Sequence, residues 1–82
     1  MDTEWNKFIA SDPEVLSGKP VVIGTRLSVE FLLGLFAAGW TEEQVLRNYP
    51  VLTAEALHAV FAYSVDCLRT ETLYAFHGGD QS

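Results

Sequence analysis

The sequence predicts a single domain that is mainly α-helical, with a short N-terminal pair of β-strands followed by a bundle of three helices. Apolar residues alternate with other residues from Val21 to Val29, which is the period of a strand buried on one face. Farther along, Ser28, Thr41 and Thr53 each precede a helical pattern of apolar residues, at the position of an N-cap. The last two helices would be joined by residues 49–52 alone, and so short a connection is typical of a helix-turn-helix.

Residues 8–29 are expected to form the strand pair. A first short strand would end at the turn-forming run Ser11-Asp12-Pro13. A second turn, residues 17–20, would lead the chain into a longer strand that starts at Val21 and turns its odd-numbered residues toward a core. Gly24 interrupts this strand in the way that a bulge would.

Arg26 is the one charged residue inside this strand pattern, and packing alone does not explain it. Three roles remain open: a contact to a phosphate or a partner's carboxylate, a salt bridge to Asp12 or Glu14 across the strand pair, or solubility at a sheet edge. We favour the salt bridge. Nucleotide binding is not expected, because Gly18 and Gly24 do not have the spacing of a phosphate loop.

The first helix is expected over residues 29–38, between the N-cap Ser28 and a terminating Gly39. Apolar side chains lie on nearly all of its sides, which leaves almost no polar face for solvent. A chain of 82 residues buries a modest fraction of its surface, so such a helix indicates a subunit interface and a homodimer or higher homo-oligomer. The residues assigned to this interface are Val21, Ile23, Leu27, Phe31 and Leu35.

The second helix has two independent start signals. Thr41 and Gln44 have the spacing of a capping box, and Trp40 and Val45 occupy the positions of a hydrophobic staple. The pair Tyr49-Pro50 is expected to end this helix, because proline cannot continue the helical hydrogen bonding.

The third helix would begin after Thr53 and be the longest of the three. The three-helix part is expected over residues 29–70, and the helical pattern continues toward Phe76. Residues 77–82 are expected to form a disordered tail. The inward face of the helix is expected to carry Leu57, Val60, Phe61, Ser64 and Leu68.

The composition narrows the classes of partner. Five Lys and Arg stand against eleven Asp and Glu, a net charge of -6, so simple electrostatic binding to nucleic acid is disfavoured. Cys67 is the single cysteine and cannot form an intrachain disulfide, and the polar first residues lack the apolar run of a signal peptide. We therefore expect a cytoplasmic protein. No membrane partner is expected, because the longest uncharged run is too short to span a bilayer.

Neither a catalytic site nor a metal or cofactor site is expected. His58 and His77 each lack a second ligand at helical spacing, which makes both surface histidines. Cys67 has no neighbouring cation to activate it, and we expect a buried or half-buried structural thiol. Because no set of acid, base and nucleophile can be assembled, we expect a protein without enzymatic activity.

Four segments together resemble a known family: SDP at 11–13, GKPVVIGTR at 18–26, Gly39 with the TEEQVL that follows, and YPVLT at 49–53. Over roughly residues 8–66 the chain is similar to the bacterial domain-of-unknown-function family 433 (DUF433), small proteins with a strand pair and a homeodomain-like three-helix part. The resemblance implies a role like that of type II antitoxins. Members are often linked to a neighbouring PIN-like ribonuclease toxin, which they would neutralise while binding DNA at their promoter.

A helix-turn-helix would place the first half of the third helix, residues 53–62, in the major groove of DNA. The exposed side chains nearest the bases would be Thr53, Glu55, His58 and Ala59. This helix is poorly suited to binding DNA, because it carries no Lys or Arg before Arg69. The residues assigned to DNA contact therefore come from the strand region, the second helix and the start of the third: Lys7, Lys19, Arg26, Arg47, Thr53 and His58.

Two tyrosines are assigned to contacts with a protein partner. Tyr63 lies off the inward face of the third helix and Tyr74 lies near the tail, and tyrosine is favoured at interfaces. An acidic surface would complement a basic ribonuclease groove; its residues are Glu42, Glu43, Glu55, Glu71 and Asp80.

The leading hypothesis is a noncatalytic antitoxin-like protein that neutralises a PIN-like ribonuclease, with autoregulation through promoter DNA as a further role. Two alternatives remain open. One is a DNA-binding helix-turn-helix regulator without a toxin, and the other is a purely structural oligomerisation module. An acidic inhibitor predicts salt-sensitive binding to a basic partner, whereas a regulator predicts a gel shift on its own upstream DNA.

Overall fold

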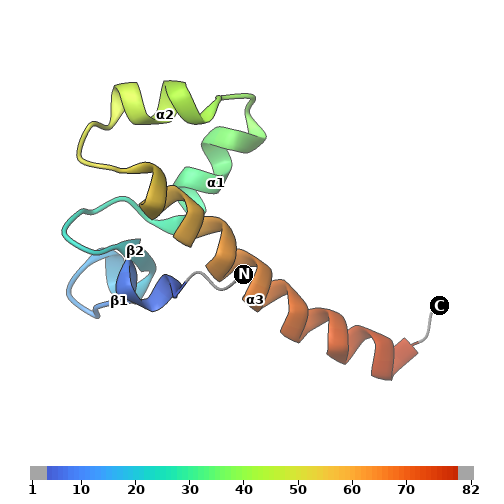
Figure 1. Ribbon diagram of the computed structural model, residues 1–82. Coiled ribbons are helices and arrows are strands. Elements are labelled where there is room, and N and C mark those ends of the chain that lie inside the picture. Colours follow the sequence, from blue (N-terminus) through green and yellow to red (C-terminus); the bar gives the residue numbers. More distant parts are fainter. Residues whose placement is uncertain (1–3, 80–82) are drawn as a thin grey trace.

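A two-stranded sheet and three α-helices make up the chain in the computed structural model, which describes the backbone of residues 4–79 and the side chains of residues 4–70 (Figure 1). The described chain begins with a short 3-10 helix (η1, Trp5–Lys7), and a second one (η2, Leu16–Gly18) lies between the strands. The predicted fold class, a strand pair followed by a three-helix bundle, is confirmed.

Strands β1 (Ile9–Ser11) and β2 (Pro20–Val22) pair antiparallel, with Ile9 opposite Val22 and Ser11 opposite Pro20. The sharp turn that precedes β2 contains Ser17 and Gly18 with φ of 58° and 85°. Positive φ favours glycine, which fits the turn predicted at residues 17–20. The sheet is small, and its inner face is completed by helix packing.

The second strand ends at Val22, so the prediction of a continuous strand to Val29 is wrong. The side chain of Thr25 closes a tight turn: its hydroxyl donates to the Val22 carbonyl at 2.8 Å and accepts from the Leu27 N–H at 3.0 Å. The Val22 N–H in turn donates to the Leu27 carbonyl at 3.0 Å. Gly24 has φ of 85° within this turn, so it supplies a turn conformation and not a bulge in a strand.

The predicted alternation of buried and exposed residues fails for the same reason. Val21 and Val22 are consecutive, yet both are 5% exposed. Ile23, which was expected to face the core with Val21, is 52% exposed. Because the turn reverses the chain here, neighbouring residues no longer alternate across one sheet.

Helix α1 (Val29–Ala37) has the predicted start and end. The Ser28 hydroxyl accepts the Phe31 N–H at 2.9 Å, which satisfies one of the free N–H groups of the first turn. At the other end Gly39 has φ of 101°, its N–H donates to the Phe36 carbonyl, and the Trp40 N–H donates to the Leu35 carbonyl. This pair of bonds is a Schellman motif.

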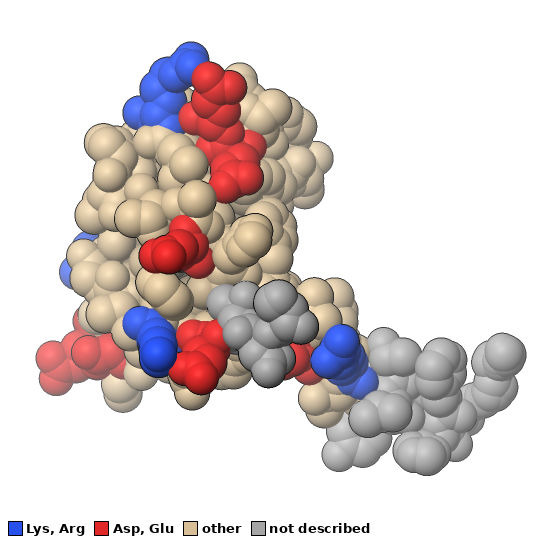
Figure 2. Space-filling view, viewed as in Figure 1, with Lys and Arg blue, Asp and Glu red and all other residues tan. Residues whose placement is uncertain are grey.

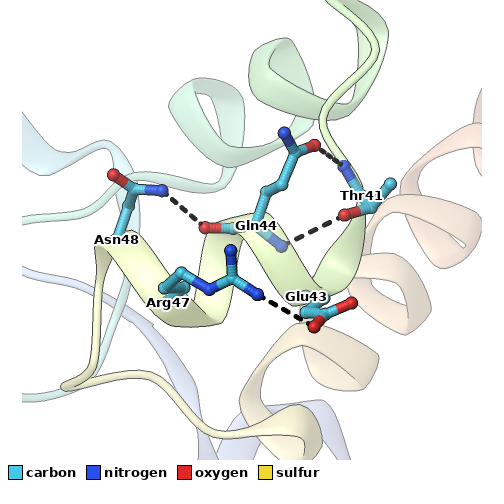
Figure 3. Close-up of polar contacts among 5 residues, drawn as sticks. All are labelled: Thr41, Glu43, Gln44, Arg47 and Asn48. Carbon is cyan, nitrogen blue, oxygen red and sulfur yellow. Dashed lines mark hydrogen bonds and ion pairs between the residues drawn. The ribbon is translucent and has the colours of Figure 1, made fainter.

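Helix α2 (Glu42–Asn48) begins with the predicted capping box, which Figure 3 shows. The Thr41 hydroxyl accepts the Gln44 N–H at 3.1 Å, and Oε1 of Gln44 accepts the Thr41 N–H at 2.8 Å. At its other end the Asn48 side chain donates to the Gln44 carbonyl at 2.8 Å. Val45 is fully buried, which anchors the helix to the core.

Helix α3 (Ala54–Gly79) begins where the sequence predicted, with the Thr53 hydroxyl accepting the Ala56 N–H at 3.1 Å. The helix is longer than expected, because its backbone continues through His77 to Gly79, where a disordered tail was predicted; residues 80–82 lie outside the described residues. In Figure 1 the second half of α3 extends well beyond the rest of the molecule.

The core lies between the strand pair, the inner sides of α1 and α2, and the first half of α3. Its buried residues are Ile9, Val22, Val29, Leu32, Val45, Leu52, Ala56, Leu57, Ala59 and Val60. Two residues predicted on the inward face of α3 are not part of it: Phe61 is 39% exposed and Leu68 is 59% exposed. Phe61 packs against the ring of Phe36 but stays at the edge of the core, and Leu68 lies farther along the helix, where its side chain remains open to solvent.

Candidate interaction surfaces

Three of the four cations assigned to DNA contact are each paired with a glutamate on the surface. Nζ of Lys7 lies 3.0 Å from Glu4. Nζ of Lys19 lies 3.1 Å from Glu30 on α1. Lys7 lies in η1 and Lys19 in the connection between η2 and β2. On the face shown in Figure 2 the blue Lys and Arg side chains stand apart from one another instead of forming one patch.

The third paired cation is Arg47 of α2, whose Nη2 lies 2.9 Å from Oε2 of Glu43, one helical turn earlier (Figure 3). Both side chains are more than two-thirds exposed, so the pair is screened by water and contributes little to stability. To contact DNA, Arg47 would have to break its ion pair with Glu43 or bring the Glu43 carboxylate close to the phosphates.

Arg26 lies exposed in the turn after β2 and makes no ion pair with any other residue of the described chain. The favoured salt bridge to Asp12 or Glu14 is therefore wrong. Oδ1 of Asp12 instead accepts the Glu14 N–H at 2.9 Å, a local turn contact between the strands. Among the three roles considered for Arg26, contact with an anion and solubility remain.

Thr53 and His58 lie near the start of α3, as a helix-turn-helix requires, and both are exposed. The Thr53 hydroxyl already serves as the N-cap of α3. Ala59, which was expected to be exposed beside them, is fully buried in the core. The accessible part of this helix start therefore carries Glu55 and His58 but no arginine or lysine.

The surface predicted for oligomer formation is divided by the fold. Val21 belongs to the interior of the single chain, so its assignment to an interface is wrong. Ile23 and Phe31 are 52% and 43% exposed, whereas Leu27 and Leu35 are half-buried. Around Phe31 a shallow depression of about 420 Å³ is lined by Lys19, Ser28, Glu30, Phe31, Gly34 and Leu35.

Tyr63, assigned to a partner contact, is half-buried and packs inside the chain. Its ring meets the ring of Trp5 edge-on, with centroids 4.8 Å apart and an angle of 83° between the planes. The indole Nε1 of Trp5 also donates to Oδ2 of Asp66 at 2.7 Å. No local sequence pattern links residues so far apart, so this contact could not be predicted. The other assigned residue, Tyr74, lies among residues whose side chains are not described.

A second groove, also of about 420 Å³, separates α1 from α3 and is mostly apolar. Its lining residues are Pro20, Val29, Glu30, Leu33, Tyr63, Ser64, Cys67 and Leu68. Cys67 is exposed, so the prediction of a buried or half-buried thiol is wrong. A hydrogen bond with Cys67, followed by partial burial, raises the pKa of the Tyr63 hydroxyl above its ordinary value.

The described part of the chain offers neither a metal site nor a membrane span. Within it, no three or more His, Cys, Asp and Glu side chains gather as they would around a metal ion. No helix in that part combines the length and the apolar character needed to cross a membrane.

The chain is similar to known proteins in both sequence and structure. A crystal structure of a DUF433 member protein from Anabaena variabilis ATCC 29413, at 2.00 Å resolution, matches with a TM-score of 0.71 and 32% identity, over 76% of this chain and 61% of that chain. The uncharacterized protein y4eO of Sinorhizobium fredii (strain NBRC 101917 / NGR234) is 36% identical over 58 residues, which is 71% of this chain.

This chain spans only 26% of the length of the Sinorhizobium protein, so the two share one region and not a whole architecture. The family model described as protein of unknown function (DUF433) matches residues 9–64, from the first strand to the middle of α3. With that match over most of its length, the chain belongs to the DUF433 family.

Proposed function

We propose that this chain is a noncatalytic, antitoxin-like protein that binds and neutralises a PIN-like ribonuclease. The kind of partner comes from the family resemblance, and the mode of binding comes from surface charge. The net charge is -6, and most of the described cations are already paired with glutamates. The surface left for a partner is therefore predominantly acidic.

The observation that carries this proposal is the pair of exposed carboxylates Glu42 and Glu55, at the starts of α2 and α3. Neither forms an ion pair with another residue of the described chain. A ribonuclease needs cations for the phosphates of its substrate, and exposed carboxylates can occupy such cations in their place. Of the other acidic residues assigned to this surface, Glu43 is paired with Arg47, the Glu71 side chain is not described, and Asp80 lies outside the described residues.

The experiment uses the protein encoded next to this one, provided that it is PIN-like, and measures binding by calorimetry and RNA cleavage by gel assay. The double variant E42Q/E55Q should weaken binding by about tenfold or more and relieve inhibition of cleavage. The matched control E4Q/E14Q removes the same charge from the strand end of the molecule and should bind as the unchanged protein does. Affinity that does not change between low and high salt would contradict the proposal.

A DNA-binding regulator without a toxin is the second candidate, and Arg26 is the observation in its favour. This exposed arginine has no carboxylate partner in the described chain and is available to a phosphate. A gel shift on the chain's own upstream DNA at low salt, abolished by Arg26→Ala, would support a regulator. If neither DNA nor the neighbouring protein binds while the chain still self-associates, the third reading, a structural oligomerisation module, would replace both.

A further inference from the structure

The residues that precede the strand pair are held on α3 through one side chain. Among residues 4–7, Trp5 is half-buried and the other three are exposed. Their backbone hydrogen bonds are local, from the Lys7 N–H to the Glu4 carbonyl and from the Phe8 N–H to the Trp5 carbonyl. The ion pair of Lys7 is also made with Glu4. Within the described part of the chain, the polar and aromatic contacts that join this segment to α3 therefore all belong to Trp5.

Two contacts at the surface hold the Trp5 side chain on α3. Its indole Nε1 donates to Oδ2 of Asp66 at 2.7 Å, and its ring meets the Tyr63 ring edge-on with centroids 4.8 Å apart. Asp66 is exposed and Tyr63 is half-buried, so water can reach both partners when the contact breaks. The ring also packs against the edge of the core. An exposed hydrogen bond and one aromatic pair are weak compared with the packing of a whole core.

The strand pair has its own anchor directly after this segment. The Phe8 carbonyl accepts the Ile23 N–H at 2.8 Å, and the next residue, Ile9, is 3% exposed and lies opposite Val22 in the sheet. The sheet and the core therefore begin at these positions without help from Trp5. A segment with few buried contacts can open while the core stays folded, so release of Trp5 would stop at Phe8.

Tyr63 belongs both to the Trp5 contact and to the groove between α1 and α3. It lines this groove together with Cys67, which lies one helical turn later on the same side of α3. Val29 and Leu33 of α1 line the same groove. A change in the orientation of the Tyr63 ring would therefore alter its contact with Trp5 and the wall of the groove at the same time.

We propose that residues 4–7 form a strap that leaves α3 when Trp5 is released, and that a group bound in the groove beside Cys67 favours this release through Tyr63. With the strap closed, Trp5 holds the Tyr63 ring and covers this side of α3. With the strap open, the Tyr63 ring is free to turn, and the side of α3 around Tyr63 and Asp66 becomes accessible. Coupling between two sites is reciprocal, so the closed strap inhibits binding in the groove.

The first test follows the exchange of the Trp5 indole N–H with solvent by NMR, on the full chain at low urea concentrations. Release of the strap exposes little surface, so this exchange should depend on urea far less than that of the Val60 amide, which lies in the core. Thr41→Ala weakens the cap of α2 and should speed the Val60 exchange about fivefold while the Trp5 exchange stays unchanged. Equal urea dependence of the two groups would mean that the segment opens only together with the core, which overturns the proposal.

A pair of variants shows whether the observed exchange reports on the contact with α3. Asp66→Ala removes the acceptor of the indole N–H and should speed the Trp5 exchange about threefold or more. The matched control is Glu55→Ala, which removes an exposed carboxylate from the start of the same helix and should leave the Trp5 exchange as it is. A Trp5 exchange rate that Asp66→Ala leaves unchanged would contradict the strap.

The second test places a group in the groove. N-ethylmaleimide can react with Cys67, because this thiol is exposed, and the added group would lie beside Tyr63. Alkylation should speed the exchange of the Trp5 indole N–H about threefold or more. The matched control is C67A/V51C alkylated in the same way, since Val51 is 62% exposed in the connection between α2 and α3, and its Trp5 exchange should not respond. Circular dichroism checks that both products are folded. If the Trp5 exchange is the same before and after alkylation of Cys67, the groove does not control the strap and the proposal fails.

Discussion

The indole Nε1 of Trp5 donates a 2.7 Å hydrogen bond to Oδ2 of Asp66, which joins η1 to α3 across 61 positions of the chain. The same indole ring packs edge-on against Tyr63, one turn earlier in the helix. Both partners of the hydrogen bond lie outside residues 9–64, the segment that defines the family match. The N-terminal segment is thus fastened to α3 near the point where that helix leaves the core.

A double-mutant cycle on this contact should give a coupling free energy of about 0.5–1 kcal/mol. Trp5→Phe keeps an aromatic ring and removes the N–H donor, and Asp66→Ala removes the acceptor. Each single change should lower the free energy of unfolding, and the double change should lower it by less than their sum. Urea denaturation measures all four proteins. Strictly additive effects would mean that the hydrogen bond does not persist in solution.

Thr41→Ala should lower the free energy of unfolding by about 1 kcal/mol, because the capping box of α2 would lose the acceptor for the Gln44 N–H. The matched control is Thr70→Ala, the same change inside α3. There, among the described residues, the hydroxyl bonds only to the Asp66 carbonyl at 3.3 Å, and its position inside the helix leaves no free N–H to cap. Its effect should stay within about 0.5 kcal/mol. Thermal unfolding of the two variants side by side checks the difference.

Two glycines of the α1 region should respond to alanine in opposite directions. Gly39 has φ of 101° in the Schellman motif, so Gly39→Ala should lower the free energy of unfolding by about 1 kcal/mol. Gly34 lies inside the helix, where an added Cβ would meet no atom within 4 Å. Gly34→Ala should raise the free energy of unfolding by up to about 1 kcal/mol. Denaturant titration that moved both midpoints in one direction would contradict this account.

The helix boundaries could be predicted from the sequence because their causes are local. Each of the N-caps Ser28, Thr41 and Thr53 bonds to an N–H three residues later, and Gly39 ends α1 through bonds to the turn before it. Such signals depend only on neighbouring residue types. The same holds for the fold class, which follows from the order of these elements.

The strand and surface predictions failed where distant or competing contacts decide. The alternating pattern after Val21 is compatible with a strand, but the Thr25 side chain closes a turn that the pattern cannot reveal. Arg26 was predicted to form an ion pair with Asp12 or Glu14, but it pairs with neither of them. Cys67 and Leu68 were expected to be covered, but they line an open groove between α1 and α3 and stay exposed. How far one helix projects beyond its neighbours is a property of the packed structure, which no local pattern records.

Tyr63 should make stability depend on pH in the alkaline range. Its pKa is raised above the ordinary 10.0, first by the hydrogen bond with Cys67 and then by partial burial. The folded state therefore holds this proton more tightly than the unfolded state. The resulting stabilisation is fully present below pH 10.0, and the free energy of unfolding falls as the pH rises through the pKa of the folded state.

The measurement compares urea denaturation of the unchanged protein and Tyr63→Phe at a series of alkaline pH values. Lysines also titrate there, so only the difference between the two proteins reports on Tyr63. Cys67→Ala removes the first cause of the raised pKa, and its tyrosinate absorbance should therefore develop at lower pH than in the unchanged protein. If Cys67→Ala left the tyrosinate titration unchanged, the hydrogen bond between these two groups would not be what holds the Tyr63 proton.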